Sequence, residues 1–102
     1  MHRVAVTGDS MRPTLLPGDR LLVVGRRLRP GALVAIRDPR DPERVLVKRV
    51  LAIDRDADSV DVAGDNAAAS TDSRVFGPVP LGLVVGRVRW RYWPPSRQGR
   101  LR

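Results

Sequence analysis

The sequence lacks several residue types, and each shortage narrows the possible chemistry. It contains no cysteine, which excludes disulfides, thiolate metal sites and a cysteine nucleophile. Its single histidine, His2, stands beside the first residue, where chains usually fray, so a Ser-His-Asp triad is not expected. No stretch reaches the ~18 apolar residues of a membrane span. We therefore expect a cytoplasmic protein.

Lysine is nearly absent as well. Of the 19 basic residues, 18 are arginine and only Lys48 is lysine. Arginine keeps its proton in proteins, whereas burial can lower the pKa of a lysine until it acts as a base. Lys48 is therefore a candidate general base. On the count alone, a leftover surface lysine is an equally open interpretation.

The excess of arginine gives the chain a net charge of +8. A basic protein of this kind can bind nucleic acid, an anionic membrane surface or an acidic partner, or can simply come from an arginine-preferring genome. Arginines are densest near the end of the chain, around Trp90, Tyr92 and Trp93. These aromatic residues leave open a peripheral membrane contact; the simpler interpretation is a last strand that covers one end of the core.

Proline and glycine divide the chain into short apolar runs of strand length. The expected strands are residues 4–7, 20–24, 32–36, 44–53, 60–63 and 84–92. No segment has the length and period of a long helix. The pattern predicts an all-β fold of short antiparallel strands, arranged as a sheet pair or a partly closed barrel. We expect one domain over residues 1–93, followed by a basic tail over 94–102 that is open to disorder.

Two residues carry the candidate chemistry. Lys48 shares a strand face with Leu46 and Val50, which are both apolar, so its ammonium is expected to be desolvated and its pKa lowered. Ser10 lies in a turn between Gly8 and Pro13, where a hydroxyl is exposed beside free backbone N–H groups. A capping serine is the simpler interpretation of that turn alone. Because 38 positions separate the two residues, only the fold can bring them together.

Three segments resemble the type I signal peptidase family. They are residues 8–15 (GDSMRPTL) with 17–19 (PGD), residues 47–50 (VKRV), and residues 64–74 (GDNAAASTDSR) with 77–80 (GPVP). All three occur in the family's order. The resemblance implies an all-β catalytic core and a Ser-Lys dyad that acts through an acyl-enzyme.

The resemblance also implies individual roles. Ser10 would be the nucleophile, Lys48 the general base, and Ser70 the hydroxyl that orients the lysine amine. The Ser10 backbone N–H would be one oxyanion donor. Some family members supply a second donor from a hydroxyl two residues before the nucleophile, but here that position is Gly8.

Three further residues follow from the same match. Asp72 and Arg74 would pair to shape the site, and Met11 would line the substrate pocket. For Asp72 and Arg74, and equally for Asp65 and Asn66, scaffolding of a long loop is an alternative to direct catalysis.

The chain also departs from membrane signal peptidases. Only nine residues precede Ser10, so no amino-terminal anchor is expected, and the interval 53–64 leaves no room for a large cap insertion. A minimal, anchorless, arginine-rich core resembles the nickel-type superoxide dismutase maturation proteases. That resemblance implies a serine endopeptidase that removes an amino-terminal leader from a precursor protein, with the dismutase precursor as its partner. On this hypothesis we expect no metal and no organic cofactor in the protease itself.

Three alternatives remain open at this point. One is a membrane-associated signal peptidase that cleaves secretory signal peptides and contacts lipid through its aromatic end. Another is a self-cleaving repressor, which also uses a Ser-Lys dyad. The third is a noncatalytic basic β domain that binds nucleic acid. The leader peptidase hypothesis involves no nucleic acid and leaves the oligomeric state open.

Overall fold

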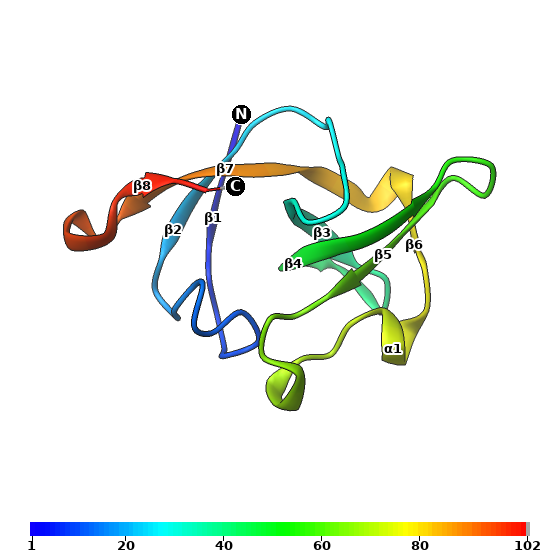
Figure 1. Cartoon of the computed structure of the whole chain (residues 1–102), viewed down its shortest axis with the longest axis horizontal. Coiled ribbons are helices and arrows are strands. Elements are labelled where there is room, and N and C mark those ends of the chain that lie inside the picture. Colours follow the sequence, from blue (N-terminus) through cyan, green and yellow to red (C-terminus); the bar gives the residue numbers. More distant parts are fainter. Residues whose placement is uncertain (102) are drawn as a thin grey trace.

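The computed structural model describes residues 1–101, and most of their regular structure is β-strand (Figure 1). The strands are β1 (His2–Ala5), β2 (Arg20–Val23), β3 (Leu33–Asp38), β4 (Asp41–Asp54), β5 (Ser59–Ala63), β6 (Val79–Pro80), β7 (Val84–Trp93) and β8 (Gly99–Arg100). The helical segments are short: η1 (Ala67–Ala69), α1 (Ser73–Phe76), η2 (Leu81–Leu83) and η3 (Pro95–Arg97). The expected all-β, antiparallel fold is confirmed.

Strand β7 joins the two halves of the sheet. Its first residues pair with β3 and its later residues pair with β2, which gives the antiparallel order β1-β2-β7-β3-β4-β5-β6. Figure 1 shows β1 and β2 on one side, β3 to β6 on the other, and β7 reaching across both. Register shifts in both β7 pairings interrupt the regular ladder, and such bulges bend a sheet. The start of the chain and β4 therefore belong to neighbouring halves of one bent sheet.

The core is divided between two clusters, one in each half of the sheet. β3 is buried on both faces: Leu33 and Ala35 enter the first cluster, whereas Val34 and Ile36 enter the second. Successive side chains of a strand point to opposite faces, so a strand covered on both faces needs an unbroken apolar run. This requirement explains why residues 32–36 contain no polar side chain.

The basic end of the chain packs against β7. β8 pairs with Trp90 and Arg91, and the Arg97 guanidinium donates to the carboxylate of Asp19. Asp19 is fully buried and also accepts a hydrogen bond from Arg91 at 3.0 Å. Arg91 and Arg97, which lie on either side of residue 93, therefore bind the same buried carboxylate. Arg102, the last residue of the expected tail, lies outside the described residues.

Candidate active site

Ser10 lies in the turn that follows β1. The turn passes through Gly8, whose φ of +77° falls in the left-handed region that glycine adopts without strain. Immediately after Ser10 the chain returns to the interior, where Met11 and Leu15 are almost wholly buried. Buried residues directly after the turn hold the Ser10 backbone in place.

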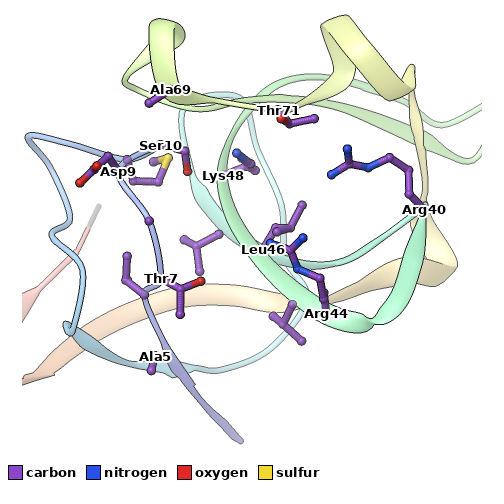
Figure 2. A pocket seen from close by; sticks show the side chains of 15 residues that line it. Ala5, Thr7, Asp9, Ser10, Arg40, Arg44, Leu46, Lys48, Ala69 and Thr71 are labelled. Carbon is purple, nitrogen blue, oxygen red and sulfur yellow. The ribbon is translucent and has the colours of Figure 1, made fainter.

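A cavity of about 290 Å³ opens beside this turn (Figure 2). Its walls come from residues 5–11, from residues 44–48 of β4, and from Arg40, Ala69 and Thr71. Figure 2 shows the Ser10 and Lys48 side chains at this cavity, with Ala69 and Thr71 on one side and Arg40 and Arg44 on another. Segments far apart in the sequence therefore share one concave surface.

Lys48 enters the cavity from the middle of β4. Its side chain is only 3% exposed, and its Nζ donates a hydrogen bond to Ser70 Oγ at 3.0 Å. Burial lowers the pKa of Lys48, and the nearby Asp72 carboxylate opposes this shift in part because it favours the charged amine. A lysine with a lowered pKa has a larger neutral fraction near pH 7, and only the neutral amine accepts a proton.

Behind Ser70 lies an ion pair. Ser70 Oγ donates to Asp72 Oδ2 at 2.9 Å, and the Arg74 guanidinium donates to both oxygens of the same carboxylate, each at 2.9 Å. The Gly64 N–H adds a further hydrogen bond at 3.0 Å. Burial alone would raise the pKa of Asp72, but the hydrogen bonds from Arg74, Gly64 and Ser70 outweigh it and hold that pKa far below its usual range. Asp72 therefore stays ionised and fixes the Ser70 hydroxyl.

The loop that carries Ser70 is tied directly to the nucleophile turn. The Asn66 N–H donates to the Ser10 carbonyl oxygen at 2.8 Å, and the Asn66 side chain donates to the Asp9 carbonyl at 3.1 Å. At position 64 a Cβ atom would lie 2.6 Å from the Ser10 carbonyl oxygen and would also overlap Ser70 Oγ. Glycine at this position is what allows Ser10 and Ser70 to approach each other.

Asp65 joins all three sequence motifs. Its carboxylate accepts from Thr14 Oγ1 at 2.6 Å and from two nitrogens of Arg49, at 2.6 and 3.2 Å. Burial opposes ionisation, but the hydrogen bonds from Arg49 and Thr14 outweigh it and lower the pKa of Asp65. These contacts favour the scaffolding interpretation of Asp65, because its charge is used to hold the segments together.

A family model described as "Signal peptidase, peptidase S26" matches residues 1–57 and 54–93. The chain belongs to this family. It is a serine peptidase of the signal peptidase type, so the alternative of a noncatalytic nucleic-acid-binding domain is wrong.

Three relatives of this S26 peptidase are mitochondrial proteases. Subunit 1a of the mitochondrial ATP-independent inner membrane protease of Arabidopsis thaliana is 41% identical, over 95% of this chain and 73% of its own length. Subunit 1b of the same protease is 37% identical, over 85% of this chain and 67% of its own length. Human mitochondrial inner membrane protease subunit 1 is 32% identical, over 97% of this chain and 74% of its own. None of the three is named for dismutase maturation. Among residues 1–101, no helix is both long and apolar enough to cross a membrane.

The predicted site residues of this S26 peptidase lie at one cavity or behind it. Ser10 and Lys48 line the same cavity, and Ser70 contacts Lys48 from behind. Asp72 and Arg74 form an ion pair. Met11 lines the cavity, but it is only 1% exposed and belongs equally to the core. The predicted residues thus form one connected arrangement.

Gly8 has a specific consequence in this peptidase. It lines the cavity, and its positive φ would strain any residue with a side chain, although no atom lies within 4 Å of an added Cβ. A hydroxyl-bearing residue at position 8 would therefore be strained in this backbone conformation.

Sequence reasoning did not single out Gly64 or the two arginines of the cavity wall. Gly64 could have been inferred, because it is the first residue of the third motif and an isolated glycine at the end of a strand suggests that another backbone approaches closely. Arg40 and Arg44 had no distinguishing signal, because they are two arginines among 18.

Proposed function

We propose that this peptidase removes an amino-terminal leader from a precursor protein, with Ser10 as nucleophile and Lys48 as general base. One observation carries the proposal. The only lysine of the chain is buried, has a lowered pKa, bonds to Ser70 and lines the same cavity as Ser10. These are the properties that a base needs in order to take a proton from a serine hydroxyl.

The reaction follows from this arrangement. Neutral Lys48 accepts the Ser10 hydroxyl proton as the oxygen attacks the scissile carbonyl carbon. When the C–N bond breaks, the Lys48 ammonium gives that proton to the leaving amine, and an ester to Ser10 remains. Water then hydrolyses the ester, with Lys48 again as base. Ser70, held by Asp72, accepts a hydrogen bond from the lysine amine and orients it. The Ser10 N–H is the proposed donor to the oxyanion.

The cavity wall also suggests how the peptide binds. β4 pairs with β5 only from Arg49 onward, so within residues 1–101 the segment 45–47 pairs with β3 on one side and has no strand on the other. That segment lines the cavity opposite residues 5–9. An extended peptide can add to such a free strand edge through backbone hydrogen bonds. This mode places a substrate backbone beside Ser10.

Two classes of precursor are candidates. The minimal core resembles the nickel-type superoxide dismutase maturation proteases, so the dismutase precursor, processed in the cytoplasm, is the first. The relatives are named as inner membrane proteases, so a precursor presented at a membrane is the second.

The test is cleavage of both substrates by the wild type, Ser10→Ala and Lys48→Arg proteins, with products mapped by mass spectrometry. The first substrate is purified nickel superoxide dismutase precursor, and the second is a signal-peptide substrate with anionic vesicles. Cleavage of the dismutase leader at one site by the wild type alone supports both the dyad and the first substrate. Cleavage of the vesicle substrate but not of the dismutase precursor, by the wild type alone, supports the dyad and the second class of precursor. Undiminished activity in either variant refutes the dyad.

A further inference from the structure

A second cavity, away from Ser10, is walled almost entirely by arginine. It measures about 550 Å³ and is lined by Arg29, Arg87, Arg89, Arg100 and Leu101. Arg29 lies in the loop after β2, Arg87 and Arg89 lie on β7, and Arg100 lies on β8. This arginine cavity shares no lining residue with the Ser10 cavity. In Figure 1 the loop after β2 and β7 lie at the top of the molecule, whereas the turn after β1 lies at the bottom.

The four arginines of this cavity have no carboxylate partner among residues 1–101. Ion pairs found in this part of the chain use six other arginines: Arg12, Arg40, Arg49, Arg74, Arg91 and Arg97. Four guanidinium groups gathered without compensating charge repel one another. An anion between them would remove that repulsion.

Arg87 is the strongest sign that the cavity has a ligand. Its side chain is only 5% exposed, and its Nε is buried without a hydrogen-bond partner in the described chain. Burial lowers the pKa of Arg87, and the charges of Arg89, Arg29 and Arg100 lower it further. Its backbone is fixed, because the Arg87 N–H donates to Gly25 and its carbonyl accepts from Val24, both at 2.9 Å. The fold thus holds an unsatisfied donor at the wall of a basic cavity.

We propose that the arginine cavity binds a phosphate group. A phosphate carries up to two negative charges and several acceptor oxygens, so it can pair with more than one guanidinium, whereas a carboxylate carries a single charge. Arginine forks match phosphate geometry bidentately. The group can come from a soluble phosphate or from a lipid headgroup.

The proposal is tested with variants that spare the buried Arg87. Arg29→Gln/Arg100→Gln removes two cavity charges at exposed positions, and Arg27→Gln/Arg55→Gln removes two charges at exposed positions outside this cavity. The matched pair keeps net charge equal. Binding of pyrophosphate is measured by calorimetry at constant ionic strength in chloride. Sedimentation is measured with phosphatidylcholine vesicles, with and without about one fifth phosphatidylglycerol. Peptidase activity and thermal unfolding report whether each variant is folded.

We expect the cavity double variant to bind at least about tenfold more weakly than the wild type, while the control variant stays within about twofold. Such a loss with pyrophosphate alone identifies a soluble phosphate, and such a loss with anionic vesicles identifies a lipid headgroup. Equal binding by the two double variants in both assays, or no binding by the wild type in either, overturns the proposal.

Discussion

Lys48 must lose a proton before it can act, so its surroundings set the pH range of the enzyme. Burial disfavours the ammonium and lowers the Lys48 pKa from the ordinary lysine value of about 10.4. The neutral fraction rises with pH, so kcat/KM should rise with pH and level off above the folded-state pKa. The midpoint should lie below the ordinary lysine value.

The Lys48→Arg variant tests that argument, because arginine keeps its proton at every accessible pH. We expect kcat to fall by about 10³-fold or more, with no recovery at high pH. Peptide hydrolysis followed from pH 6 to pH 10 measures both effects, and thermal unfolding confirms that the variant is folded. A midpoint at or above the ordinary lysine value in the wild type would contradict the role given to burial.

Gly64 supports the reaction without touching the substrate. Gly64→Ala should lower kcat by about tenfold or more, because the added methyl group pushes Ser70 and the Ser10 backbone apart. Gly82→Ala is the matched control: nothing lies within 4 Å of a Cβ added there. The initial rates and KM of both variants are measured and compared with those of the wild type. Equal rates would show that the close approach at position 64 has no bearing on catalysis.

At the scale of elements, apolar runs and proline or glycine breaks predicted each of the long strands, but strand ends depend on side-chain contacts that such runs do not reveal. Residues 38–42 contain two prolines and suggest a loop. The buried Asp38 carboxylate instead accepts from the Arg40 N–H at 2.9 Å and pairs with the Arg40 guanidinium, so β4 begins at residue 41. A local turn of this kind overrides the composition of the segment.

The short helix α1 depends on Asp72, which caps its first turn through the Arg74 N–H at 3.1 Å. Since the folded-state pKa of Asp72 is depressed, its stabilising effect is complete above the unfolded-state value of about 3.9 and is lost as the pH falls below it. We expect Asp72→Asn to lower the free energy of unfolding by about 2–3 kcal/mol at pH 7. This is less than the loss expected for a fully buried ion pair, because about half of the Arg74 side chain stays in solvent.

Urea unfolding at pH 7 and pH 3 measures this difference. The gap between the wild type and Asp72→Asn should narrow at pH 3, because the wild type then binds a proton on unfolding and loses its advantage. Asp56→Asn, at an exposed position, serves as the control and should change stability by less than about 0.5 kcal/mol. A gap that stays constant between the two pH values would argue against an ionised Asp72 in the folded state.

At the scale of the whole molecule, the position of Ser10 and Lys48 at one cavity could not be derived from periodicity. Alternation assigns a side chain to a face, but it does not say which strands are neighbours, and here β7 separates β2 from β3. The match to three family motifs identified the residues, and the bent sheet places both of them at the same cavity. The arginine cavity escaped prediction for the same reason, since its members are far apart in sequence and resemble every other arginine.

The net charge of +8 and the two arginines of the cavity wall should make substrate capture depend on charge. For a peptide with two acidic residues near the scissile bond, we expect kcat/KM to fall about three- to tenfold between 0.05 and 0.5 M NaCl, as screening shortens the reach of the field. For the matching peptide, in which amides replace the two carboxylates, kcat/KM should change by less than about twofold over the same salt range. The kcat of both peptides should stay constant. Arg44→Gln should reduce the salt response of the acidic peptide, because Arg44 lines the cavity and makes no ion pair among residues 1–101. If both peptides responded equally, the positive field would have no part in choosing substrates, and the arginine content would need another explanation.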